Sequence, residues 1–80
     1  MEARDMVRMA NQIAGFFAAY PHDEAVKETI SHIEHFWDPR MRRHLADYIA
    51  RTTEGLDPIA REAAIALAAP AVHSAEKAQA

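Results

Sequence analysis

The chain has 80 residues, half of them apolar, and it contains no cysteine. This length supports one small domain, and the lack of cysteine excludes disulfide bonds, thiolate zinc sites and iron–sulfur ligation by these residues. The formal net charge of −3 at pH 7 argues against general nucleic-acid binding, which needs a basic surface. We therefore expect a small domain without covalent or metal cross-links, which relies on a partner for part of its stability.

The first predicted helix ends before Pro21. Large apolar residues recur in it at spacings of three and four, which is the periodicity of one helix face. These residues are Met6, Met9, Ile13, Phe16, Phe17 and Tyr20. The amides of Asn11 and Gln12 lie inside the same helix. They are either exposed to water or available to hydrogen-bond the backbone of a partner.

A second helix is predicted to begin at Asp23 and Glu24, because acidic residues are favoured at a helix N-terminus. Its predicted apolar stripe consists of Val26, Ile30, Ile33 and Trp37, with Phe36 at the margin. Phe36 and Trp37 are adjacent, as are Phe16 and Phe17, and adjacent side chains on a helix point about 100° apart. Two interpretations remain open: all four aromatics are core, or at least one member of a pair is an interface anchor.

One face of the second helix carries Glu28, His32 and His35 at spacings of four and three. This spacing can place two imidazoles and a carboxylate around one metal ion, with His44 as a candidate fourth ligand. The competing interpretation, which we favour, is that these are ordinary surface residues. A metal-binding helical protein is therefore kept as an alternative function.

The third helix is predicted to begin at Asp38-Pro39, an N-cap followed by proline at the first helical position. Arg40, Arg42 and Arg43 then fall near its N-terminus, where each cation costs about 0.3–1 kcal/mol at low salt. Three interpretations are open: a solvated face offset by local acids, docking on acidic groups of a protein partner, or contact with phosphates. Arg40 and Arg43 face one way, and Arg42 lies about 160° from Arg40. A nucleic-acid binder using this segment is the weakest alternative, because the rest of the chain is acidic.

The remaining apolar pattern is also helical. In the third helix the predicted apolar face consists of Met41, Leu45, Tyr48 and Ile49. Gly55 is a plausible left-handed cap for its end. Asp57-Pro58 repeats the same start signal and opens a fourth, alanine-rich helix. Its predicted stripe consists of Ile59, Ala63, Ala66 and Leu67.

The fold class predicted is all-α, a small bundle of three to four short helices. We expect residues 1–69 to form a single helical domain and residues 70–80 to form a flexible or disordered tail, which lacks a clear apolar stripe. The charged N-terminus has no apolar segment of the secretory type, and no stretch approaches the roughly 20 apolar residues that span a bilayer. A cytoplasmic location without membrane contact is expected.

Three sequence runs carry a family resemblance: residues 6–14, residues 16–21 and residues 32–43. The first contains Met-Ala-Asn-Gln-Ile-Ala, and the last contains Phe-Trp-Asp-Pro-Arg-Met-Arg. Together they resemble the delta subunit of bacterial soluble NAD-dependent formate dehydrogenases, which carry molybdenum or tungsten. The resemblance covers roughly residues 6 to 65.

The resemblance implies a non-catalytic accessory chain that supports assembly or stability of the catalytic and diaphorase subunits. These larger subunits are expected to hold the metal–pterin cofactor, iron–sulfur clusters, FMN and NAD, and none of these is expected on this chain. The sequence shows no cysteine nucleophile, no recognisable acid–base pair and no glycine-rich phosphate loop, so no catalytic residue is predicted. The predicted partner-binding residues are Met9, Asn11, Gln12, Phe36, Trp37, Pro39, Arg40, Arg42 and Arg43.

Overall fold

The computed structural model describes residues 2–69, and that part of the chain is all-α. Its four helices are α1 (Ala3–Phe17), α2 (His22–Phe36), α3 (Pro39–Ile49) and α4 (Pro58–Leu67). The predicted fold class is therefore confirmed. The expected tail, residues 70–80, lies outside the described residues. No helix within residues 2–69 combines the length and the apolar character needed to cross a membrane.

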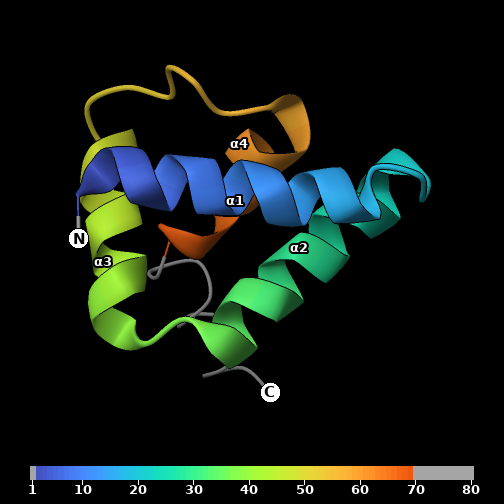
Figure 1. The fold of residues 1–80 in the computed structure, drawn as a ribbon, viewed down its shortest axis with the longest axis horizontal. Coiled ribbons are helices and arrows are strands. Elements are labelled where there is room, and N and C mark those ends of the chain that lie inside the picture. Colours follow the sequence, from blue (N-terminus) through green and yellow to red (C-terminus); the bar gives the residue numbers. More distant parts are fainter. Residues whose placement is uncertain (1, 70–80) are drawn as a thin grey trace.

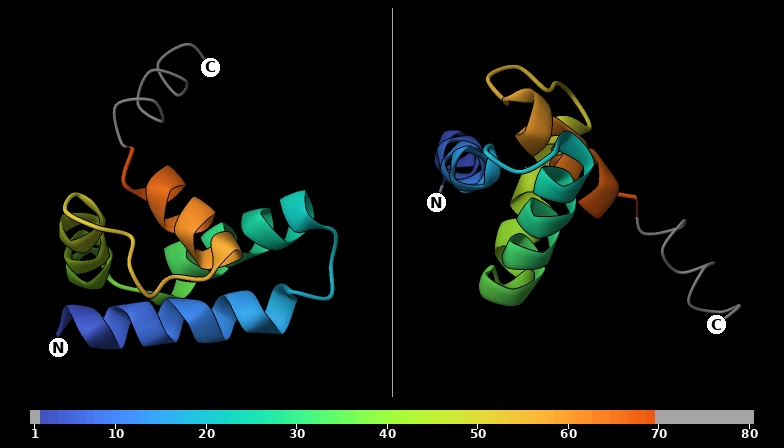
Figure 2. Two further views of the ribbon diagram at one scale, coloured as in Figure 1. Left: turned by 90° about the horizontal axis from the view of Figure 1, so that it is seen from above. Right: turned by 90° about the vertical axis from the view of Figure 1, so that its right-hand side faces the viewer.

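The helices form a three-sided arrangement with the last helix behind it (Figure 1). α1 and α2 are joined by a short turn and diverge from it, while α3 stands at the far end of α1. The view from above shows that α4 lies behind α1 (Figure 2), and α4 contacts each of the other three helices. α2 and α3 make little contact with each other. α4 therefore packs behind both α1 and α2.

Local start signals place the beginnings of α3 and α4 as expected. The Asp38 carboxylate accepts a hydrogen bond from the backbone N–H of Met41 at 2.9 Å, so Asp38 is a true N-cap and Pro39 is the first helical residue. Asp57 and Pro58 occupy the same positions at the start of α4, but the Asp57 side chain makes no capping bond. The Asp-Pro signals were therefore right about both helix starts.

Two boundary predictions were wrong. α2 begins at His22 with Pro21 as its N-cap, so Asp23 and Glu24 lie in its first turn and do not cap it. α3 ends at Ile49, well before Gly55, so this glycine does not cap the helix. Gly55 does have a positive φ of 88°, but it uses this conformation inside the loop that leads to α4.

The loop before α4 is tied to α1 by one side chain. Asn11 Nδ2 donates to the carbonyl of Gly55 at 2.8 Å, and Asn11 Oδ1 accepts from the backbone N–H of Asp57 at 2.9 Å. A second tie joins His22 Nε2 to a carboxylate oxygen of Glu62, linking the start of α2 to α4. These contacts fix α4 against the first two helices.

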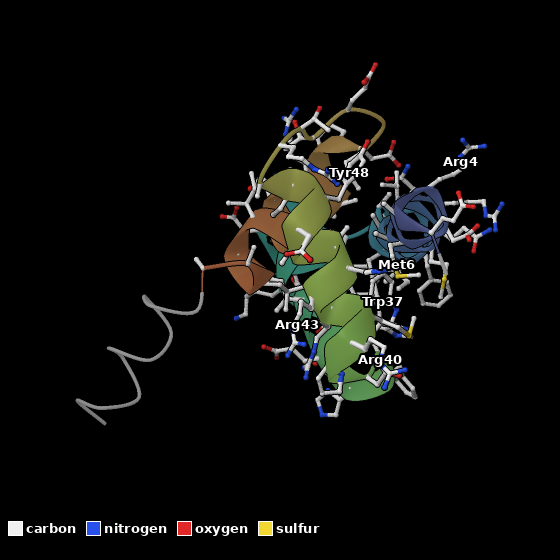
Figure 3. All side chains as sticks on the ribbon, turned by 90° about the vertical axis from the view of Figure 1, so that its left-hand side faces the viewer. Arg4, Met6, Trp37, Arg40, Arg43 and Tyr48 are labelled. Carbon is white, nitrogen blue, oxygen red and sulfur yellow. The ribbon has the colours of Figure 1, made fainter. Side chains whose placement is uncertain are left out.

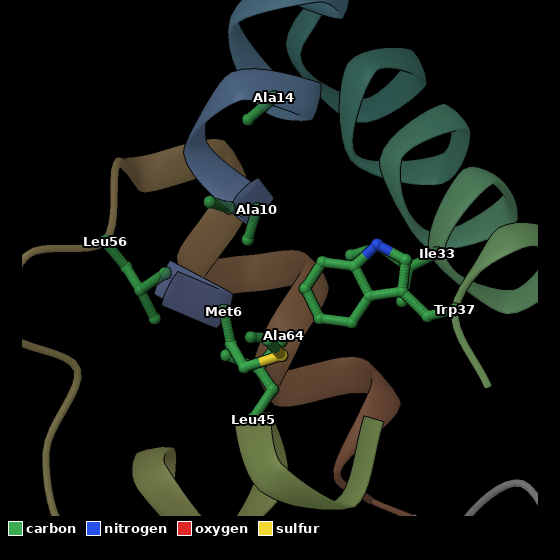
Figure 4. Close-up of a cluster of buried hydrophobic side chains, with 9 residues drawn as sticks. Met6, Ala10, Ala14, Ile33, Trp37, Leu45, Leu56 and Ala64 are labelled. Carbon is green, nitrogen blue, oxygen red and sulfur yellow. The ribbon is translucent and has the colours of Figure 1, made fainter. Parts of the chain in front are cut away.

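The core is a single cluster in which small side chains surround a few large ones (Figure 4). The large members are Met6, Ile33, Trp37 and Leu45, with Leu56 from the loop. The small members are Ala10 and Ala14 of α1 together with Ala60 and Ala64 of α4. Alanine side chains let two helices pack at a short interaxial distance. The interior is therefore compact but contains few large apolar groups.

The predicted apolar stripes were partly wrong, because in α1, α2 and α4 small residues are buried at positions next to the larger residues that were predicted. In α1 the buried residues are Met6, Ala10 and Ala14, while Phe16 and Tyr20 are exposed. In α2 they are Ala25, Thr29 and Ile33, and in α4 they are Ala60, Ala63 and Ala64. The buried face of each of these helices consists mainly of small residues, because close helix packing leaves no room for their larger neighbours. Thr29 is satisfied within its own helix, since its hydroxyl donates to the Ala25 carbonyl at 2.8 Å.

Candidate functional site

The most distinctive surface lies between α1 and α2 and is aromatic. A hollow of about 260 Å³ opens there, lined by Gln12, Ile13, Phe16, Phe17 and His32. Phe16 is 76% exposed, and Phe36, at the end of α2, is 73% exposed. We call the set Ile13, Phe16, Phe17, His32 and Phe36 the aromatic face. Large apolar side chains this exposed are typical of interaction surfaces when they are grouped.

The rings of the aromatic face touch one another in series from α1 to α2. Phe16 and Phe17 meet edge to face with centroids 5.0 Å apart, and Phe17 lies 6.4 Å from the His32 ring. His32 stacks on Phe36 at 4.6 Å with a tilt of 33°. Contacts of this kind hold exposed rings in defined positions. The rings of the aromatic face are therefore in contact with one another within the chain itself.

Helix geometry explains why rings appear outside as well as inside. Trp37 is only 5% exposed and belongs to the core, whereas its neighbour Phe36 points to solvent. Phe17 is half-buried, and its neighbour Phe16 points to solvent. Adjacent positions diverge by about 100°, so one core cannot take both members of a pair. The interpretation in which all four aromatics are core is wrong; whether the exposed rings anchor an interface stays a prediction.

The second feature is the group of Arg40, Arg42 and Arg43 at the N-terminal end of α3, which we call the arginine corner. Arg40 and Arg43 are exposed and line a hollow of about 420 Å³ together with Asp38 and Pro39. Arg42 is half-buried and lines a neighbouring hollow, and its guanidinium donates to the Glu34 carbonyl at 3.5 Å. Arg40 and Arg42 thus border different hollows, and Arg43 borders both.

None of these arginines is paired with a carboxylate in the part of the chain that the structure describes. The nearby acid Asp38 is engaged as the N-cap of α3, and the first turn of α3 contains no acidic residue. Local acids therefore do not neutralise the arginine corner through ion pairs. Figure 3 shows Arg40 on the side of α3 where Trp37 lies, and Arg43 borders the same hollow as Arg40.

The comparison with protein families gives a match over residues 5–64 to the NADH-dependent formate dehydrogenase delta subunit FdsD. The match spans 60 of the 80 residues, from the first turn of α1 to the middle of α4. The chain belongs to this family. No curated protein and no solved structure matches the chain significantly.

The residues predicted to bind partners occupy different environments in this delta subunit. Gln12 is exposed and lines the aromatic hollow, and Pro39 is exposed beside Arg40. Met9 is half-buried against the core cluster. Asn11 has its oxygen and an amide N–H bonded within the chain, and Trp37 is buried. Partner contact by these residues stays a prediction, and the exposed ones are the better placed for it.

The metal site kept as an alternative is not formed in the part of the chain that the structure describes. Within residues 2–69 no group of three histidine or acidic side chains is arranged to hold a metal ion. The His35 Nδ1–H donates to the Ser31 carbonyl at 2.8 Å, and the His32 ring is stacked against Phe36. Local backbone and aromatic contacts therefore orient the two imidazoles, and Glu28, His32 and His35 do not gather around one shared site.

The predicted partner-binding set leaves out four members of the aromatic face: Ile13, Phe16, Phe17 and His32. The available signal was the spacing of Gln12 and Phe16 on one helix and of His32 and Phe36 on the next, each four residues apart. This spacing places each pair on one side of its helix. The meeting of the two pairs depends on how α1 and α2 pack, which local pattern does not encode.

Proposed function

We propose that this delta subunit is a non-catalytic accessory subunit that binds the larger subunits of a formate dehydrogenase and supports their assembly or stability. In this proposal the catalytic and diaphorase subunits oxidise formate to carbon dioxide and reduce NAD. The observation that carries the proposal is the family match across residues 5–64, which includes most of the four helices. The exposed aromatic face supports it, because it provides a surface suited to another protein.

The cofactors of such an enzyme belong, in this proposal, to the larger subunits. A metal–pterin cofactor of molybdenum or tungsten and iron–sulfur clusters are placed on them, with FMN and the NAD site. The 80 residues supply no thiolate for a cluster, because cysteine is absent. The hollows described above are open to solvent. The contribution of this chain is therefore contact with protein.

Binding and stability are linked for a chain of this kind. Its core relies heavily on alanine, which buries little apolar surface per residue. A partner that binds only the folded chain stabilises it by about 2.7 kcal/mol when the free partner is at 100 times the dissociation constant. The same linkage acts in the other direction, because this chain stabilises whichever partner conformation it binds.

The test is to remove this chain from the native host and, separately, to recover it with an affinity tag. We expect the tagged chain to bring down the larger subunits with formate-dependent NAD reduction in the eluate. Without the chain, we expect less intact complex and lower activity in the extract. An eluate free of the larger subunits, together with unchanged activity in the deletion strain, would contradict the proposal. The amount of this chain in the active eluate separates a permanent subunit from an assembly factor.

A further inference from the structure

The aromatic face ends beside the arginine corner. Phe36 is the last residue of α2 and the outermost ring of the series, and Arg40 follows four residues later in the first turn of α3. The exposed Phe36 and the exposed Arg40 therefore lie only four positions apart in the chain, on the two sides of the α2–α3 connection.

Within residues 2–69, the rings of this surface are not covered and its arginines are not paired with carboxylates. Phe16 and Phe36 keep about three quarters of their side chains in water. Arg40 and Arg43 have no ion pair there, although cations near a helix N-terminus are unfavourable. Both halves would be stabilised by the same kind of partner, one that covers the exposed rings and places carboxylates beside the arginines.

We propose that the aromatic face and the arginine corner form one docking surface for an amphipathic helix of a larger formate dehydrogenase subunit. The apolar stripe of that helix lies between α1 and α2, and acidic residues at one end meet Arg40 and Arg43. This inference rests on the proposed function, because it takes the occupant from the same complex.

The shape and chemistry of the surface select this occupant. Its walls are two helices, with Ile13 and Phe16 on one side and His32 and Phe36 on the other, and side chains of a third helix fit between such ridges. A hollow of about 260 Å³ accepts a large apolar anchor, which is how interface hot spots are built. The exposed Gln12 amide on the rim is available for a hydrogen bond to the occupant.

A second copy of this chain fits less well. The aromatic face contains no carboxylate, and Asp38 beside the arginines is already engaged as a helix cap. Two such faces placed together would cover the rings but leave the arginine corners without acidic partners. The charge of the surface therefore favours a different, acidic partner.

The test is a calorimetric titration of the full chain into the larger subunits, purified from a host that lacks it. The wild-type chain must bind; if it does not, the proposed function itself fails. Phe16→Ala/Phe36→Ala is expected to weaken binding at least ~30-fold. The control Ile65→Ala removes a half-exposed apolar side chain from α4 and is expected to change binding less than about twofold.

A second pair of variants tests the arginines. Arg40→Glu/Arg43→Glu is expected to weaken binding about tenfold and to reduce its dependence on salt. The control Arg51→Glu reverses an exposed charge just beyond the other end of α3 and should leave binding unchanged. Carboxylates near the N-terminus of α3 favour that helix, so weaker binding by the double variant would not result from unfolding.

Two results would overturn the inference while the proposed function stands. One is unchanged binding by the folded Phe16→Ala/Phe36→Ala variant. The other is an isolated chain that sediments as a dimer and is dissociated by these substitutions, with binding to the larger subunits unaffected, since the occupant is then a second copy. If the double variant loses its helical circular dichroism, Gln12→Arg at the rim replaces it, and unchanged binding by that variant overturns the inference equally.

Discussion

The interior of the bundle and the aromatic face use apolar residues in opposite ways. The interior packs alanines of α1 and α4 around Met6, Ile33, Trp37 and Leu45. The aromatic face leaves Phe16 and Phe36, both larger than any alanine beside them, in water. A chain that needed apolar volume only for its own stability would bury these rings first. The contrast indicates that the interior makes the fold, and it supports the proposal that the aromatic face serves another molecule.

The most decisive test of this difference truncates two adjacent aromatics separately, one in the interior and one on the aromatic face. Trp37→Ala is expected to cost about 3–5 kcal/mol of unfolding free energy, because it empties a nearly buried site. Phe36→Ala is expected to cost below about 1 kcal/mol, since most of its side chain is already in water. Urea denaturation followed by circular dichroism measures both. Equal losses would mean that the aromatic face is part of the core.

A second substitution tests how tightly the small side chains pack. Ala10→Leu is expected to destabilise the chain by about 1–3 kcal/mol, because Ala10 is fully buried where α1 meets α4. Arg4→Leu introduces the same side chain at an exposed position of α1 and should stay within about 0.5 kcal/mol. Thermal unfolding of the two variants distinguishes a close-packed interior from one that can expand.

Asn11 and Gln12 give a smaller contrast between adjacent polar residues. Asn11→Ala removes two hydrogen bonds that tie the loop before α4 to α1, at an expected cost of about 1–2 kcal/mol. Gln12→Ala removes no hydrogen bond within residues 2–69 and is expected to change stability by less than about 0.5 kcal/mol. Hydrogen exchange at the amide of Asp57 reports the loss directly. If exchange there is unaffected by Asn11→Ala, the tie does not hold the loop.

The smallest expected effect compares the two Asp-Pro helix starts. Asp38→Ala is expected to cost about 1 kcal/mol, because the Asp38 carboxylate caps the N–H of Met41. Asp57→Ala should cost only a few tenths of a kcal/mol, since the Asp57 side chain makes no capping bond. Equilibrium unfolding of the two variants orders them, and the reverse order would contradict the capping geometry.

The sequence correctly predicted features that depend only on residues close together in the chain. Asp38-Pro39 and Asp57-Pro58 marked two helix starts correctly, because capping and the fixed φ of proline act within a few residues. For the adjacent aromatics, the sequence left open whether all four rings are core or one member of a pair is an interface anchor. Which member turns outward was not predictable, because that depends on the helix packed opposite.

Features that depend on distant parts of the chain were missed. Asn11 bonds to residues 44 and 46 positions away, and no local pattern indicates such partners. The buried faces of α1 and α4 were predicted mainly from large apolar residues, whereas in the structure close packing buries mostly alanines there. The aromatic face escaped notice for the same reason, since it forms only when α1 and α2 pack together.

Hydroxyl-radical footprinting with mass spectrometry tests the central claim most directly. It compares oxidation of the full chain alone with oxidation of the chain in the purified complex. We predict that oxidation of Phe16 and Phe36 falls several-fold in the complex, while that of Ile65 on α4 is unchanged. Equal oxidation of Phe16 and Phe36 in the two states would contradict the account, because the aromatic face would then remain uncovered in the assembled enzyme.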